Sequence, residues 1–188
     1  MDVFLYRHGI TQGNAEKRYI GRTDEPLCEQ GRLQLLDRRA NAPLVNRVFL
    51  SPALRARQSA AILFPRAELS VVDDLREMDF GIFEGKTADE MTDDRDYRAW
   101  VEGQCAGRCP QGESTDEFGK RCLRGFQQIV SMHHANEPLV IVAHGGTIMA
   151  IMSKLGRPAR EMWDWRVAPG SHIKSEFVGG YLINHTFA

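Results

Sequence analysis

The sequence lacks the features that mark membrane proteins and broad nucleic-acid binders. None of its apolar runs approaches the roughly 20 residues that a membrane-spanning helix needs. Basic residues are not in excess either, because 24 Lys and Arg stand against 25 Asp and Glu, for a net charge of −1. We therefore expect neither a membrane nor a nucleic-acid partner. A small anionic ligand remains compatible with this charge, since it needs only a few local cations.

Signs of export and of metal binding are also missing. The first residues, MDVFLYRHG, contain Asp2 and only a short apolar stretch, so we expect no secretory signal and a cytoplasmic location. In that compartment the cysteines are expected to be free thiols. The "CAGRC" spacing is one residue too long for a redox pair, and no second pair would complete a zinc site, so we expect no cofactor. The four cysteines are Cys28, Cys105, Cys109 and Cys122.

What the chain does contain is ordinary for a globular protein. Hydrophobic residues make up 43% and charged residues 26%, without an internal repeat, which predicts one domain over residues 1–188. Short apolar runs alternate with amphipathic segments, which predicts an α/β fold with a largely parallel sheet. The predicted strands are 2–6, 47–51, 68–75 and 137–146 with a closing hairpin at 171–187, the predicted helices are 28–41, 52–64, 93–103, 113–135 and 147–156, and 77–87 is predicted to be an irregular loop.

Charged side chains and imidazoles stand where the predicted strands end, which is where ligands bind in parallel sheets. The first strand ends in Arg7 and His8, and the last long apolar strand ends in His144. Arg55 follows the second strand, and the third region leads into Glu77. Arginine suits phosphate oxygens, and a neutral imidazole is a good nucleophile toward phosphorus. Since a carboxyl group can protonate a leaving oxygen, the set predicts metal-independent phosphoryl transfer.

Each of these residues also has an ordinary structural interpretation. Arg7 and His8 could simply end a strand at the surface. His144 could be a hydrogen-bonded core histidine, and Arg55 a solvated charge on a helix. Glu77 could pair with a neighbouring arginine or with a helix end. Taken together, the residues favour a ligand site over separate structural roles. All of them fall where a ligand site is expected, and each supplies a different chemical role.

Six blocks of the sequence, in order, resemble those of the histidine phosphatase superfamily, the phosphoglycerate-mutase-like enzymes. The blocks are RHGITQGN, YIGRTDEPLCEQGRLQ, SPALRARQSA, LREMDFGIFEG, PQGES and VAHGG. They run from residue 4 to about 150 and so cover most of the chain. The resemblance implies a three-layer αβα sandwich around a mostly parallel sheet.

The resemblance also implies a role for each matching residue. His8 would be the nucleophile that forms a phosphohistidine, and Glu77 the general acid for the leaving group and then the base for water. Asn14 would help to hold the phosphate or the nucleophile loop. The phosphate pocket would be lined by Arg7, Arg55, His144 and the backbone of Gly145. The rest of the substrate would be bordered by Gly21, Arg22 and Thr23.

Four positions depart from the family's pattern. Ile10 stands where many members have Glu, Ser59 replaces a common Thr, and Phe83 replaces a common Trp. Met149 stands where mutase-like members often carry Arg. None of these changes removes a proposed catalytic group, but the last one weakens the prediction of a mutase-type grip on the substrate.

The segment EMWDWRVAPGSHIKSEF resembles the corresponding part of the alpha-ribazole-5'-phosphate phosphatases of cobalamin assembly. The compact stretch from Glu77 to His144 also favours hydrolysis over mutase activity. Alpha-ribazole 5'-phosphate is therefore the favoured small phosphorylated substrate. The alternatives are a broad-specificity phosphatase, a phosphoglycerate mutase and a non-catalytic module that binds phosphorylated ligands. Tyr97 and Trp100 could stack on a nucleoside-like base or form the buried face of a helix.

Overall fold

A six-stranded sheet lies at the centre of the computed structural model, which describes residues 1–133 and 137–188. The order of its strands is β3-β2-β4-β1-β5-β6. The first four are parallel to one another, and β5 and β6 form an antiparallel hairpin at one edge. The strands are β1 (Asp2–Arg7), β2 (Arg47–Leu50), β3 (Glu68–Val71), β4 (Leu139–Ala143), β5 (His172–Val178) and β6 (Tyr181–Phe187).

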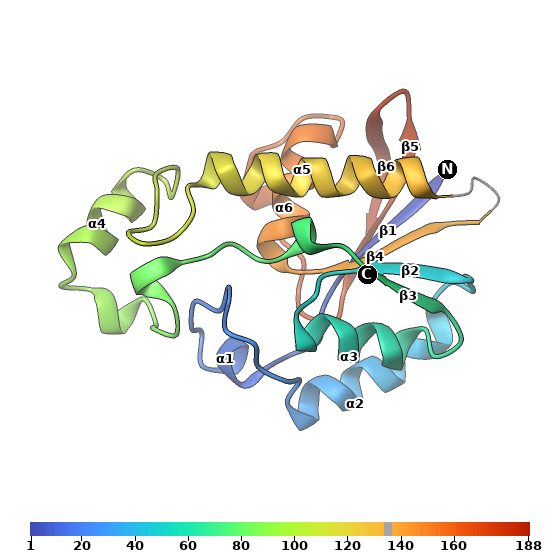
Figure 1. Cartoon of the computed structure of the whole chain (residues 1–188), viewed down its shortest axis with the longest axis horizontal. Helices are drawn as coiled ribbons and strands as arrows, with labels where there is room; N and C mark the ends of the chain where they lie inside the picture. The colour runs from blue at the N-terminus through green and yellow to red at the C-terminus, as the bar shows by residue number, and fades with distance from the viewer. Residues whose placement is uncertain (134–136) are drawn as a thin grey trace.

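Helices cover both faces of the sheet and make three layers (Figure 1). Helices α2 and α3 lie on one face, and α5 and α6 lie on the other. The predicted αβα sandwich with a mostly parallel sheet is thereby confirmed. The helices are α1 (Gln12–Ala15), α2 (Glu29–Arg38), α3 (Leu54–Leu63), α4 (Arg95–Glu102), α5 (Thr115–Met132) and α6 (Gly145–Leu155), with 3₁₀ turns η1 (Arg39–Asn41), η2 (Asp73–Leu75), η3 (Gly81–Phe83), η4 (Asp89–Met91) and η5 (Met162–Trp165).

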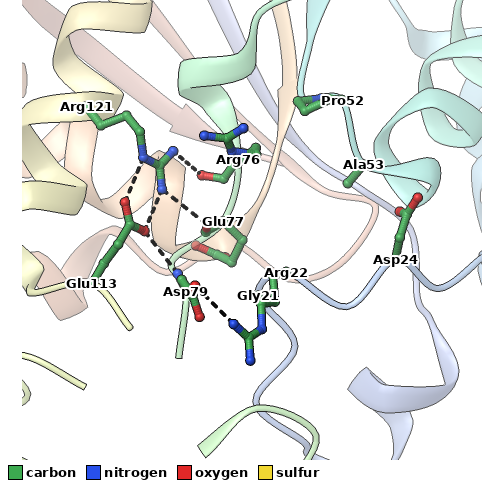
Figure 2. A pocket seen from close by; sticks show the side chains of 10 residues that line it. All are labelled: Gly21, Arg22, Asp24, Pro52, Ala53, Arg76, Glu77, Asp79, Glu113 and Arg121. Atoms are coloured by element: carbon green, nitrogen blue, oxygen red, sulfur yellow. Dashed lines mark hydrogen bonds and ion pairs between the residues drawn. The ribbon is translucent and has the colours of Figure 1, made fainter. Parts of the chain in front are cut away.

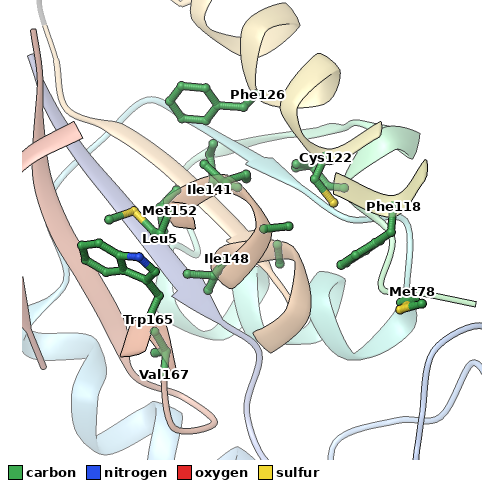
Figure 3. Close-up of a cluster of buried hydrophobic side chains, with 14 of the residues drawn as sticks. Leu5, Met78, Phe118, Cys122, Phe126, Ile141, Ile148, Met152, Trp165 and Val167 are labelled. Atoms are coloured by element: carbon green, nitrogen blue, oxygen red, sulfur yellow. The ribbon is translucent and has the colours of Figure 1, made fainter. Parts of the chain in front are cut away.

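Strand β4 is buried on both faces, and this explains its uninterrupted apolar run. Ile141 packs with Leu5 and the residues of α6 on one side of the sheet, as Figure 3 shows. Val140 and Val142 pack on the other side, in the cluster formed with α2 and α3. Each face of the sheet thus has its own hydrophobic core. In the described part of the chain, no helix is both long and apolar enough to cross a membrane.

The pairing of β1 with β4 determines where the candidate residues meet. Arg7 lies opposite Ala143 in the register, and the backbone N–H of His8 donates to the carbonyl of Ala143 at 3.0 Å. His8 and His144 therefore leave the sheet side by side. Strand β2 joins the same edge, because the N–H of Ser51 donates to the carbonyl of Val142 at 3.0 Å.

Several predicted boundaries were wrong, for local reasons. Pro52 does not open a helix, because Ala53 is extended and serves as N-cap, so that α3 begins at Leu54. The predicted strand 68–75 ends at Val71, because residues 73–75 turn into η2. Helix α6 begins at Gly145 instead of residue 147, which makes both glycines of the pair part of its first turn.

The other boundaries differ by smaller amounts. The predicted helix 28–41 ends as an α-helix at Arg38 and continues to residue 41 as a 3₁₀ turn, and the strand predicted at 137–146 spans only β4. The predicted loop 77–87 contains η3, and the helix predicted at 93–103 is α4. Ser114 and Glu117 form a capping box that starts α5 two residues after the predicted start. The predicted end of that helix at residue 135 lies outside the described residues.

Candidate active site

His8 is buried at the carboxyl end of β1, and it is positioned as a neutral imidazole. Its Nδ1 lies 2.7 Å from the carbonyl oxygen of Gly9. Since a carbonyl can only accept, Nδ1 carries the proton and the lone pair resides on Nε2. No described residue forms a hydrogen bond with that Nε2. Burial lowers the pKa of His8 to about 3, with further contributions from the charges of Arg55 and Arg7.

Arg7 carries a donor without a partner next to this imidazole. Its Nη1 donates to the carbonyl of Val167 at 2.8 Å, whereas its buried Nε finds no hydrogen-bond partner among the described residues. Gly145 closes over the guanidinium, because a Cβ atom there would lie only 3.2 Å from the Cζ of Arg7. A buried unpaired donor is rare in proteins and calls for an acceptor that binds there.

Arg55 and His144 form the buried floor of the same site. The Nε of Arg55 donates to Nδ1 of His144 at 3.3 Å, so Nε2 of His144 carries the proton. That Nε2 lies 2.7 Å from the hydroxyl of Ser51. Burial, followed by the charge of Arg55, lowers the pKa of His144 well below its ordinary value. The rings of His8 and His144 meet edge to face with centroids 5.1 Å apart.

The loop that contains Gly21 and Thr23 covers Arg55. The carbonyl oxygens of Gly21 and Thr23 accept from the guanidinium at 2.9 and 2.7 Å. The backbone N–H groups of the same two residues donate to the carboxylate of Glu84 at 2.8 and 2.9 Å. Glu84 therefore fixes the loop that in turn fixes Arg55. Arg22 extends from this loop into solvent and lies 3.5 Å from the carboxylate of Asp79.

Glu77 supplies the carboxyl group of the site from the irregular segment between η2 and η3. Its two oxygens accept from the backbone N–H groups of Met78, at 3.0 Å, and Gly146, at 2.9 Å. Burial raises the pKa of Glu77 above its ordinary value, although these hydrogen bonds and two nearby arginines oppose the shift. Gly146 must lack a side chain, because a Cβ there would collide with the carboxyl group.

A cavity of about 490 Å³ opens beside Glu77 (Figure 2). Most of its described lining residues are charged, and none of them is aromatic. Tyr97 and Trp100 lie elsewhere: with Tyr19, Phe80 and Phe83 they form an aromatic cluster, and both are less than a tenth exposed. The lining residues are Gly21, Arg22, Asp24, Pro52, Ala53, Arg76, Glu77, Asp79, Glu113 and Arg121.

Of the predicted site residues, Gly21, Arg22 and Glu77 are among the described residues that line this cavity. Two other residues singled out in the sequence, Asn14 and Ile10, make local structural contacts. The side-chain oxygen of Asn14 accepts from the N–H of Thr11 at 3.4 Å, in the capping box of α1. The carbonyl of Ile10 accepts from the N–H of Cys28 at 3.0 Å, and its backbone lies against Gly31. Nothing in the structure explains why an apolar side chain occupies position 10.

Four residues at the site were not identified from the sequence. The matching blocks contain Ser51, Glu84 and Glu113, so the resemblance already indicated that these three residues belong near the site. Arg121 had a different signal. It lies on the apolar stripe of α5 between Phe118 and Gly125, where a charged residue is buried only when it is paired. Among the described residues, no group of three histidine, cysteine or acidic side chains is placed to hold a metal ion.

Comparisons with known proteins agree on the family of this chain. The model of the histidine phosphatase superfamily (branch 1) matches residues 3–184. A probable phosphoglycerate mutase, GpmB, of Klebsiella pneumoniae is 34% identical over 166 residues, which are 85% of this chain and 77% of that protein.

Solved structures share the whole fold. The alpha-ribazole phosphatase of Shigella flexneri superimposes with a TM-score of 0.86 at 25% identity, covering 97% of this chain and 93% of that one. A structure from Escherichia coli K-12 also gives a TM-score of 0.86, over 100% of this chain and 94% of that one. At 24% identity this second likeness shows the fold alone.

Proposed function

This chain belongs to the histidine phosphatase superfamily and is an enzyme of that type, and from this premise we propose that it is a phosphomonoesterase acting through His8. The observation that carries the proposal is the state of the imidazole. Its proton is held on Nδ1 by the carbonyl of Gly9, and its lone pair stands on Nε2. Nε2 attacks phosphorus, the ester oxygen leaves, and water then releases phosphate from the phosphohistidine.

The two arginines and the other polar groups around His8 stabilise the transferring phosphoryl group. Arg7 offers its unpaired buried Nε, and Arg55 and His144 lie against the same side of the site. The backbone N–H of Gly145 adds a donor from the first turn of α6. Charge on the equatorial oxygens is thus met by donors that are already in place before the reaction.

Glu77 serves as the general acid and then as the general base. A carboxyl group whose pKa is raised keeps its proton closer to neutrality and can give it to the departing oxygen. The resulting carboxylate then accepts a proton from the water that attacks the phosphohistidine. The cavity beside Glu77 supports this role, because it offers room for the leaving group next to the acid.

A small phosphorylated metabolite is the substrate class that fits this site. Alpha-ribazole 5'-phosphate, and with it a part in cobalamin biosynthesis, is the first candidate because a structural neighbour carries the name alpha-ribazole phosphatase. Tyr97 and Trp100 are not available to stack on its base, so the charged cavity would have to recognise the leaving group. The names of the curated relatives favour a second candidate, phosphoglycerate mutase activity. Gly21, Arg22 and Thr23 border the substrate in either case.

The test is phosphate release in the presence of EDTA. The substrates are p-nitrophenyl phosphate, alpha-ribazole 5'-phosphate and 3-phosphoglycerate, and the proteins are the wild type and His8→Ala. We expect release that depends on His8 and survives EDTA. Metal-dependent turnover by His8→Ala would contradict the proposal. Isomerised phosphoglycerate without free phosphate would favour the mutase, and binding without turnover across the panel would favour a binding module.

A further inference from the structure

Arg121 on α5 forms a buried, two-pronged ion pair with Glu113. Its Nε donates to one carboxylate oxygen at 2.8 Å and its Nη2 to the other at 2.7 Å. The arginine is only 9% exposed. Fork-to-fork pairs of this kind hold a fixed geometry, unlike single contacts between exposed charges. The pair is therefore a rigid unit at the wall of the cavity, as Figure 2 shows.

The remaining hydrogen bonds of this pair reach the backbone on both sides of Glu77. Nη1 of Arg121 donates to the carbonyls of Asp74, at 3.0 Å, and Arg76, at 2.9 Å. Nη2 also approaches the carbonyl of Glu77 itself, at 3.3 Å. On the other side, the carboxylate of Glu113 accepts from the N–H of Asp79 at 3.0 Å.

The segment held in this way has little regular structure of its own. Residues 76–80 belong to no helix or strand and lie between η2 and η3. A second contact comes from Thr147 of α6, whose hydroxyl lies 3.3 Å from the carbonyls of Leu75 and Arg76. The position of Glu77 thus depends on side chains that reach across from α5 and α6.

We propose that the pair of Arg121 and Glu113 positions Glu77 for proton transfer to the leaving group. The inference rests on the proposed function, in which Glu77 is the general acid. Neither member of the pair needs to touch the reacting atoms, because both act through the backbone of residues 74–79. A displacement of about 1 Å at a catalytic group can reduce a rate by about 10²-fold, so the loss of this support has a measurable consequence.

The nature of the leaving group separates this role from a merely structural one. An alkoxide leaves poorly unless it is protonated, whereas 2,4-dinitrophenolate leaves without a proton. A positioning defect at Glu77 therefore slows alkyl phosphates and spares 2,4-dinitrophenyl phosphate. General loss of structure slows both. The value of kcat/KM reports only the steps up to departure of the leaving group, so the later role of Glu77 as a base does not enter.

The experiment compares Arg121→Met with Arg124→Met. Arg124 lies on the same helix and contacts the same segment, but it binds the side chain of Asp74, at 2.7 and 3.0 Å, and is 64% exposed. For Arg121→Met we expect kcat/KM to fall about 10²-fold on glycerol phosphate and less than about 3-fold on 2,4-dinitrophenyl phosphate. Arg124→Met should match the wild type on both substrates.

Two further variants keep the outcome decisive if Arg121→Met unfolds. Glu113→Gln and Arg121→Lys each keep part of the pair, and both should show the same selective loss, to a smaller extent. Equal losses on the two substrates in variants that melt at the wild-type temperature would overturn the inference, as would no loss on either. Phosphorylation of wild-type His8 by 2,4-dinitrophenyl phosphate is followed in parallel. Its absence would refute the proposed function itself, and its presence alongside equal losses would refute only the positioning role.

Discussion

The two sides of the candidate site are built in different ways. On the phosphate side, His8 and His144 directly follow β1 and β4, and backbone hydrogen bonds of the sheet place them. On the leaving-group side, Glu77 lies in an irregular segment that side chains from α5 and α6 hold in place. The nucleophile therefore depends on the register of two strands, and the acid depends on the packing of two helices.

Burial has opposite effects on the two pKa values but the same effect on charge. It lowers the pKa of His8 to about 3 and raises that of Glu77, and both shifts favour the neutral form. A neutral imidazole can attack and a protonated carboxyl group can donate. The fold thus prepares the acid and the nucleophile by one physical means, although it positions them by two.

The largest effect is expected when the phosphate side is damaged. Arg55→Met should lower kcat/KM about 10³-fold on every ester, because a donor to the phosphoryl oxygens is lost whatever the leaving group. Arg57→Met is the matched control, since Arg57 is exposed and, among the described residues, donates to the carbonyl of Pro52 alone. Steady-state kinetics on alkyl and aryl phosphates measure both. If kcat/KM of Arg55→Met fell on alkyl esters alone, Arg55 would act on the leaving-group side, and the distinction between the two sides would be wrong.

Glu77→Gln should give a smaller loss that depends on the leaving group. We expect a fall in kcat/KM of about 10²-fold on alkyl esters and little change on 2,4-dinitrophenyl phosphate, because only the former need a proton. The same reasoning predicts that wild-type kcat/KM on alkyl esters falls as the pH rises through the raised pKa of Glu77. A pH profile that is identical for both ester classes would contradict this assignment.

The depressed pKa of His8 predicts a loss of stability in acid. In the unfolded chain His8 has a pKa of about 6.5, so it binds a proton below that pH. In the folded chain the same imidazole stays neutral until the pH approaches about 3. The contribution of neutral His8 to the free energy of unfolding is fully present above about pH 6.5. It is lost as the pH falls toward the folded-state pKa of about 3. From His8 we expect a loss of about 2 kcal/mol between about pH 6.5 and about pH 5, in urea unfolding.

His8→Asn provides the reference for this pH effect, because its side chain does not titrate. The free energy of unfolding should depend more steeply on pH in the wild type than in the variant over this interval. Parallel curves would show that folding does not lower the pKa of His8. His144 contributes in the same direction in both proteins, since its pKa is also lowered.

The smallest effect concerns Asn14, which we propose holds the nucleophile loop through its bond to Thr11. Asn14→Ala should cost about 1 kcal/mol of stability, as the loss of a capping interaction does. Asn14→Asp keeps an acceptor for the N–H of Thr11 and should unfold at the wild-type urea concentration. If Asn14→Asp is as unstable as Asn14→Ala, the capping role is wrong.

The sequence was most informative on the phosphate side. Apolar runs that end in charged residues or imidazoles indicate strand ends, and parallel strands bring those ends to one edge. Arg7, His8 and His144 could therefore be grouped from their positions in the chain alone. The start of α3 was harder, because Pro52 and Ala53 both tolerate a helix and only tertiary contacts decide.

The leaving-group side could be predicted only in part. Glu77 was recognisable, but the two residues that hold its backbone are 36 and 44 positions further along the chain, in contacts that no periodicity describes. Arg121 was detectable as a buried charge on an apolar stripe, while its partners were not. The helical spacing of Tyr97 and Trp100 fits a surface that stacks on a base as well as it fits the hydrophobic core. The structure shows that both pack in the core.

The most direct test of the account is to find the phosphoryl group on the enzyme. The wild type is mixed with 2,4-dinitrophenyl phosphate in EDTA, quenched in alkali to preserve a phosphohistidine, digested and analysed by mass spectrometry. We predict one added phosphoryl group on His8 within the first turnover and none in His8→Ala. Turnover without a covalent intermediate, or a phosphoryl group on any other residue, would contradict the account.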